Sequence, residues 1–129
     1  MQCPSCKKDT MRPWTGMITR IGLEIEAAGR RCGSCGETIF EGDEVQRQER
    51  EIAAVLVARG VRTAAEFKFV RKVAGFRATE IAELLGVRPE TVSRWERGEA
   101  EVPRSAAFAL GELFDRPRVT REKLEAFAR

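Results

Sequence analysis

A chain of 129 residues with a formal net charge of +3 at pH 7 can hold one domain or two small ones. The charge is only mildly basic, so electrostatics alone does not predict a nucleic-acid partner. Because the sequence has no histidine and no phosphate-cradling glycine loop, a Ser-His-Asp triad is excluded, and we expect no enzymatic activity.

The N-terminus, Met1-Gln2-Cys3-Pro4, lacks the apolar core of a secretory signal. No apolar run approaches the length of about 18 residues that a membrane span needs. We therefore expect a cytoplasmic protein with no membrane partner. In a reducing compartment, closely spaced cysteines indicate metal ligands or redox groups before they indicate disulfides.

All four cysteines lie in the first 36 residues, as two C-x-x-C pairs separated by 25 residues: Cys3, Cys6, Cys32 and Cys35. Two such turns can aim four thiolates at one centre, and four protein ligands leave no position open for water. This pattern predicts one structural Zn²⁺ per chain, with Gly33 and Gly36 easing the positive-φ geometry of the turn. A thiol redox protein or sensor is the alternative, because C-x-x-C pairs also serve that chemistry.

The segment between the cysteine pairs has the period of a half-buried strand. Ile21, Leu23 and Ile25 alternate with polar residues and glycine, so one or two strands are predicted there, with these three side chains in the core. From Asp43 to Arg59 the pattern becomes helical. The apolar second half of that helix is expected to pack against the following domain.

The remainder of the chain has the pattern of five helices separated by short loops. Thr63 and Glu66 form a capping box that predicts a helix start. The predicted helices span residues 63–75, 78–85, 89–97, 103–114 and 120–127. The predicted domains are a four-cysteine zinc-binding module (1–40), a connecting helix or linker (41–62) and an all-α domain (63–129).

Residues 78–98 meet the steric requirements of a helix-turn-helix. Ala82 is small where the two helices approach, and Gly86 supplies the positive φ of the turn. Apolar contacts would come from Ile81, Leu85, Val87, Val92 and Trp95. The predicted fold class is therefore α+β: a small N-terminal four-cysteine zinc module with short antiparallel strands, a connecting helix and a five-helix domain.

The second helix of this motif is expected to contact DNA, because Val92 and Trp95 face inward and leave charged residues outward. Arg94 is the strongest candidate for reading a base, since an arginine can bond guanine O6 and N7 together. Glu90 and Thr91 are further base-contact candidates. The phosphate-contact candidates are Arg77, Thr79, Arg88 and Arg97. The alternative is an exposed helix face whose Glu90 and Arg94 pair with each other and have no DNA role.

The segments Leu85-Gly86-Val87 and Thr91-Val92-Ser93-Arg94-Trp95-Glu96-Arg97-Gly98 resemble the phage-repressor, or Xre, type of helix-turn-helix. Joined to two C-x-x-C pairs, they resemble the MqsA antitoxin family, also called YgiT-type zinc-finger antitoxins. The resemblance implies an antitoxin that represses a type II toxin-antitoxin operon. Its zinc module would bind a toxin, a small ribonuclease.

The resemblance also implies that Glu90 and Arg94 contact operator DNA. Glu90 stands where the family has an amide side chain, so the resemblance does not carry the family's adenine contact over to this position. A homodimer on double-stranded DNA is expected, because one short helix reads few bases. For the toxin, the first candidates are Arg20, Glu24 and Glu26. A stand-alone transcription factor that contains zinc is the alternative function.

Overall fold

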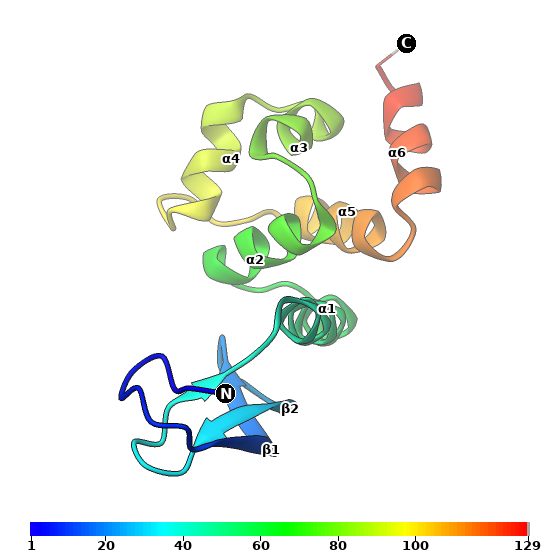
Figure 1. The fold of residues 1–129 in the computed structure, drawn as a ribbon. Helices are drawn as coiled ribbons and strands as arrows, with labels where there is room; N and C mark the ends of the chain where they lie inside the picture. The colour runs from blue at the N-terminus through cyan, green and yellow to red at the C-terminus, as the bar shows by residue number, and fades with distance from the viewer. Residues whose placement is uncertain (129) are drawn as a thin grey trace. The chain divides into compact units, whose positions relative to one another are not determined.

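The computed structural model describes residues 1–128 and places three strands before six helices (Figure 1). This arrangement confirms the predicted α+β class. In chain order the elements are β1 (Met11–Arg20), β2 (Leu23–Cys32), β3 (Thr38–Ile39), α1 (Gly42–Arg59), α2 (Ala64–Ala74), α3 (Ala78–Leu85), α4 (Pro89–Glu96), α5 (Arg104–Asp115) and α6 (Pro117–Ala126). Within the described part of the chain, every helix is too short or too polar to cross a membrane.

The chain divides into two compact units, Met1–Ile52 and Ala53–Arg129, which we call the sheet unit and the helical unit. The division falls inside α1. The first turns of this helix therefore belong to the sheet unit, and its last turns belong to the helical unit.

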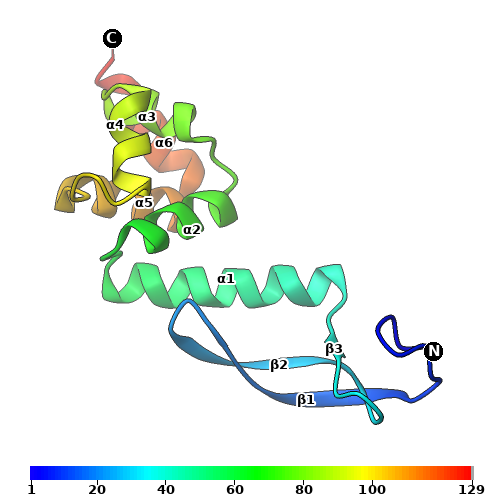
Figure 2. The ribbon, with the colours of Figure 1, turned by 90° about the vertical axis from the view of Figure 1, so that its left-hand side faces the viewer.

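The sheet unit is built on one antiparallel sheet with the strand order β1-β2-β3 (Figure 2). Ile21 and Gly22 form the turn between β1 and β2, with φ values of 47° and 80°. Two left-handed residues in a two-residue loop match the twist of a hairpin. The prediction that Ile21 belongs to a strand and to the core is wrong: it lies in this turn and is only half-buried, while Ile25 and Ala27 are buried.

The first half of α1 is fastened to β2 by charged side chains. The Arg47 guanidinium donates to Glu44 at 2.6 Å, to Glu51 at 2.7 Å and to the backbone carbonyl of Glu26 at 2.8 Å. Gln48, which is only 1% exposed, donates to Glu44 at 3.1 Å. These hydrogen bonds from Arg47 and Gln48 lower the pKa of Glu44 to about 2.

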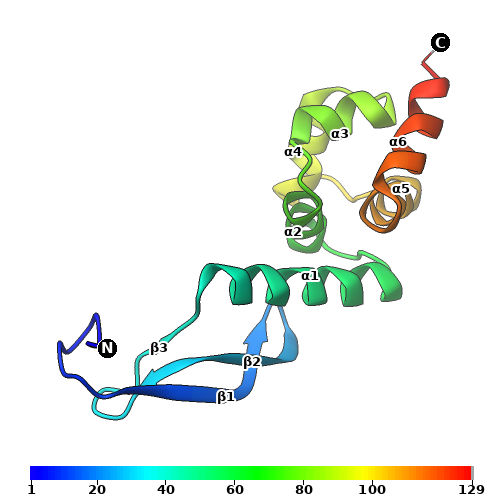
Figure 3. The same cartoon turned by 45° about the vertical axis from the view of Figure 1, so that its right-hand side comes forward.

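The helical unit has its core between α2, α3, α4 and α5 (Figure 3). The Glu66 N–H donates to the Thr63 hydroxyl at 3.1 Å, as the capping box predicts. The Glu66 carboxylate accepts from the Arg62 N–H and from Arg59, both at 3.0 Å. The last helix begins at Pro117 and not at Thr120, because proline is well suited to the first position of a helix.

The second half of α1 belongs to the helical unit, as its apolar pattern predicts. Leu56 is fully buried there. At Gly111 in α5, an added Cβ would lie 3.2 Å from Val57 Cγ1, so this pair marks a close approach of the two helices.

Candidate metal centre and nucleic-acid interface

The two C-x-x-C pairs bring all four thiols together at one end of the sheet unit. The ligand atoms of Cys3, Cys6, Cys32 and Cys35 lie within 4.8 Å of one another. Two Sγ–Sγ distances are 3.5 Å for Cys3 and Cys35 and 3.6 Å for Cys6 and Cys32. Metal–sulfur bonds of about 2.3 Å in a tetrahedron separate the sulfurs by about 3.8 Å. The cluster is therefore sized to hold a metal ion.

The two cysteine turns have the same backbone geometry. In the first, the Lys7 N–H donates to the Cys3 carbonyl at 2.9 Å; in the second, the Gly36 N–H donates to the Cys32 carbonyl at 3.0 Å. Lys7 and Gly36 both have positive φ, 67° and 79°. Gly36 has the predicted conformation, but Gly33 does not; in the first turn the left-handed position belongs to Lys7, which the sequence reasoning missed.

Hydrogen-bond donors around the four cysteines stabilise the thiolate form of Cys32 and Cys3. The Thr10 hydroxyl lies 2.9 Å from Cys32 Sγ, and the Ser34 and Cys35 N–H groups donate to the same sulfur at 3.4 Å. The Thr10 contact, followed by these N–H groups, lowers the pKa of Cys32 to about 6. The Cys6 N–H likewise lowers the pKa of Cys3.

Cys35 differs from Cys3 and Cys32, because its pKa is raised. The Glu37 N–H lowers the pKa of Cys35, but the Cys3 thiol and burial raise it, to about 12 in all. Thiolates this close repel one another unless a cation binds among them. Met11 and Ile39 pack against the cluster and give it an apolar surround.

The three candidate toxin contacts do not share one face of the hairpin. Arg20 pairs in register with Leu23, whereas Glu24 pairs with Thr19. Because side chains alternate along a strand, Glu24 and Glu26 lie on the face opposite to Arg20. Glu24 and Glu26 are exposed, and Arg20 is half-buried.

In the helical unit, α3 and α4 form the predicted helix-turn-helix. Gly86 ends α3 with φ 69°, and the next N–H, of Val87, bonds back to the Ala82 carbonyl at 2.9 Å. Ala82 is 1% exposed. On α4, Val92 is fully buried, and Trp95 meets Phe67 of α2 edge to face with 5.8 Å between ring centroids.

A buried ion pair also holds α4, and it was not predicted. Arg71 of α2 donates to both carboxylate oxygens of Glu96, at 2.6 and 2.9 Å, and to the Phe76 carbonyl at 2.9 Å. The two side chains are 10% and 8% exposed. A bidentate pair fixes orientation as well as distance, so α4 is held in a defined position against α2.

The opposite face of α4 presents the predicted base-contact residues. Glu90 and Arg94 are exposed, and Thr91 is half-buried. Among the described residues, Glu90 and Arg94 form no ion pair with each other, and neither has an oppositely charged partner within 4 Å. Arg94 does lie near enough to Glu99 to help Arg97 lower the pKa of that carboxyl. The ion pair that the alternative interpretation requires is therefore not formed.

The four predicted phosphate-contact residues lie in different environments. Arg88 and Thr79 are exposed, at the starts of α4 and α3. Arg77 precedes α3, and both its N–H and its Nε donate to Glu80, at 3.0 and 3.1 Å. Arg97 donates to Glu99 and to the Ser93 hydroxyl, each at 2.9 Å.

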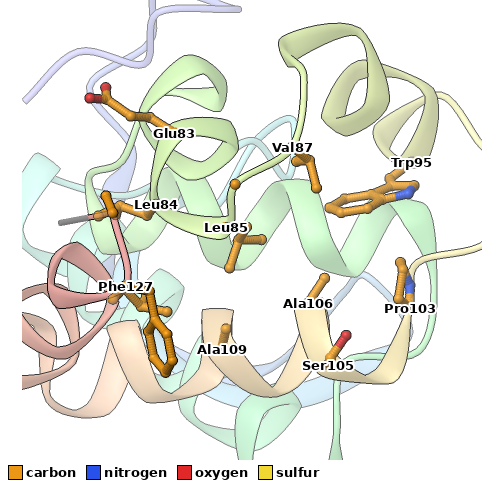
Figure 4. A pocket seen from close by; sticks show the side chains of 13 residues that line it. Glu83, Leu84, Leu85, Val87, Trp95, Pro103, Ser105, Ala106, Ala109 and Phe127 are labelled. Carbon is orange, nitrogen blue, oxygen red and sulfur yellow. The ribbon is translucent and has the colours of Figure 1, made fainter.

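Behind the turn between α3 and α4 lies a cavity of about 400 Å³ (Figure 4). Leu85, Val87, Trp95 and Phe127 point toward it. Its described lining is mainly apolar and also includes the polar side chains of Glu83 and Ser105.

The packed α3–α4 pair, its glycine turn and its buried tryptophan define a helix-turn-helix protein. Comparison with family models agrees: the model of the helix-turn-helix domain family matches residues 47–124, and the chain belongs to this family.

Two curated relatives are named as putative HTH-type transcriptional regulatory proteins. The one from Pyrococcus furiosus is 44% identical over 50 residues, and the one from Pyrococcus horikoshii is 37% identical over 54 residues. The matches cover 39% and 42% of this chain but only 16% and 17% of the relatives. This chain is therefore similar to a small part of each.

Proposed function

We propose that this protein regulates transcription by inserting α4 into the major groove of operator DNA. One observation carries the proposal: Arg94 is exposed without an ion pair on a helix whose other face is locked into the core by Val92, Trp95 and Glu96. A fixed helix with an available guanidinium can present bidentate donors to guanine O6 and N7. The names of the two Pyrococcus relatives support the same function.

The remaining candidates take supporting roles in this proposal. Glu90 can accept from cytosine N4, and the Thr91 hydroxyl can bond either a base or the backbone. Arg88 and Thr79 are exposed and available to phosphates. Arg77 and Arg97 would exchange their present carboxylate partners, Glu80 and Glu99, for phosphates on binding.

The test is Arg94→Ala in a binding assay with the DNA region upstream of the chain's own gene and a shuffled duplex of equal length. We expect discrimination between the duplexes to fall by roughly 10- to 100-fold, the value of one bidentate base contact. Arg118→Ala is the matched control, because Arg118 is an exposed arginine on α6, outside the helix-turn-helix. Unchanged discrimination in Arg94→Ala would place the sequence readout elsewhere.

We further propose that the four cysteines hold one structural Zn²⁺, because a set of four sulfur donors suits this ion and the distances suit its tetrahedron. Metal analysis of the native protein should find about one tightly bound zinc per chain, with no thiol accessible to alkylation. A metal-free protein with rapidly cycling cysteines would favour the redox alternative instead.

The finer proposal is an antitoxin and repressor of a type II toxin-antitoxin operon. It rests on the combination of a four-cysteine sheet unit with a helix-turn-helix, and it gives the sheet unit a partner, a small ribonuclease toxin. Co-expression with the neighbouring genes and copurification tests it. If no ribonuclease copurifies, the antitoxin role fails, and the stand-alone regulator suggested by the relatives' names remains.

A further inference from the structure

A groove of about 530 Å³ follows one side of α5 in the helical unit. Its lining includes Val57, Val61, Val102, Gly111 and Phe108, together with the charged side chains of Arg62, Arg104, Glu112 and Asp115. Phe108 is 71% exposed. An exposed phenylalanine in a groove that combines apolar and charged side chains can serve both hydrophobic contact and charge recognition.

Gly111 leaves the wall of the groove without a side chain at this position. Gly111 is buried, and an added Cβ there would come within 3.2 Å of Val57 Cγ1. The surface carries an exposed aromatic ring next to a recess whose wall includes Val57 and Gly111.

Charges are placed symmetrically about Phe108. Arg104 lies four residues before it and Glu112 four residues after it, so all three share one face of α5. Arg104 is exposed and has no ion pair among the described residues. Glu112 has a side chain that is 27% exposed and that pairs with Arg116.

We propose that a second copy of this chain docks on the groove, with the two α5 helices antiparallel about a two-fold axis at Phe108. In this arrangement Phe108 of each copy enters the groove of the other beside Gly111. Arg104 then faces the partner's Glu112, and the same pair recurs on the other side of the axis. A two-fold interface requires one patch to complement itself, and a basic and an acidic end equidistant from one aromatic residue meet that requirement.

This inference rests on the proposed function, for which it supplies the dimer that binds two half-sites of an operator. Its test begins with the oligomeric state of the full-length, metal-loaded protein, measured by sedimentation velocity over a range of concentrations. We expect wild type to be a dimer and Phe108→Glu to dimerise about 30- to 100-fold more weakly, as at a central interface residue.

Phe127→Glu is the matched control, because Phe127 is 88% exposed and lies outside the groove. It should dimerise as wild type does. Circular dichroism of both variants checks the fold, which an exposed side chain should not affect. A dimer that survives Phe108→Glu, or one that is lost in Phe127→Glu, would overturn the proposed interface.

A charge exchange tests the register without relying on Phe108. Arg104→Glu alone and Glu112→Arg alone each place like charges across the axis, so each variant should dimerise more weakly than wild type. An equimolar mixture of the two should restore dimers, because opposite charges then meet at both contacts. If mixing restores nothing, the antiparallel register is wrong.

Three outcomes relate this inference to the proposed function, and the last two separate them. If Phe108→Glu is monomeric and still binds its upstream DNA with reduced cooperativity, both proposals stand. If wild type is a monomer both free and on that DNA, the interface is wrong while DNA binding by α4 survives. A wild-type dimer that shows no preference for the upstream DNA would contradict the proposed function alone.

Discussion

Two arginines of the helical unit show how the environment decides what one residue type does. Arg94 is exposed on α4 and makes no ion pair among the described residues, which leaves its guanidinium available to a ligand. Arg71 is buried and directs its donors to Glu96 and the Phe76 carbonyl. The first is a candidate for recognition; the second positions the helix that carries it.

Removing one member of the buried pair should be strongly destabilising. Arg71→Met leaves the Glu96 carboxylate buried without its partner, and we expect the free energy of unfolding to fall by about 3–5 kcal/mol. Chemical denaturation followed by circular dichroism measures this. The double variant Arg71→Met, Glu96→Leu should recover much of the loss, because no buried charge remains. A loss under about 1 kcal/mol in the single variant would show that Glu96 gains water instead.

The low pKa of Glu44, about 2, predicts an acid-dependent contribution of this group to the stability of the sheet unit. A carboxyl group whose pKa falls on folding stabilises the folded state above its unfolded pKa of about 4.3, and loses that contribution as the pH falls toward 2. NMR titration of the Glu44 carboxyl carbon should give a midpoint near 2. Arg47→Gln should move the midpoint upward, since Arg47 is the main cause. A wild-type midpoint above 4 would contradict the hydrogen-bond network.

Among the helices and strands, sequence signals predicted the bounds that depend on residues close together in the chain. The bounds of α3 and the start of α4 were predicted correctly, because Gly86 and Pro89 punctuate an apolar helical period. The strand prediction failed at Ile21, since an alternating pattern does not reveal where a hairpin turns. The Arg71–Glu96 pair was missed because its members are 25 residues apart, and only the packing of α2 on α4 brings them together.

The turn of the helix-turn-helix offers a test of backbone strain alone. Gly86 has φ 69°, and an added Cβ would meet nothing within 4 Å. Gly86→Ala should therefore reduce the free energy of unfolding by about 1–2 kcal/mol, the cost of a left-handed conformation for a residue with a Cβ. Thermal or chemical denaturation measures it.

Gly42→Ala is the control for this change, because Gly42 begins α1, also has open space around it and lacks the positive φ. It should be neutral or slightly stabilising. If Gly86→Ala and Gly42→Ala lower the free energy of unfolding equally, the positive φ of residue 86 is not the reason that glycine is needed there.

For the molecule as a whole, the two units differ in what stabilises them. The helical unit has a core of large apolar side chains, including Phe67, Leu110 and Leu113. The sheet unit has a small cluster in which Cys3 and Cys32 are themselves the buried residues, together with Met11. A small unit of this kind usually depends on a metal.

Chelation should therefore unfold the sheet unit and leave the helical unit folded. Cys3→Ser should have the same effect without a chelator, because the cluster loses one ligand. Hydrogen exchange measured by mass spectrometry would show lost protection in β1 and β2 and retained protection in α2 to α5. Ser34→Ala, inside a cysteine turn but not a ligand, should change neither unit. Loss of protection in both units after chelation would show that they fold as one.

The aromatic composition gives each unit its own optical signal. The chain has two tryptophans and no tyrosine, and each unit contains one of the tryptophans. Trp14 lies under the Arg31 guanidinium at 4.1 Å and near Phe40. Trp95 lies on the buried face of α4, the helix proposed to bind DNA, and packs on Phe67. In Trp14→Phe, the remaining tryptophan fluorescence reports on the helical unit alone. In Trp95→Phe, it reports on the sheet unit alone. Neither variant needs an attached dye.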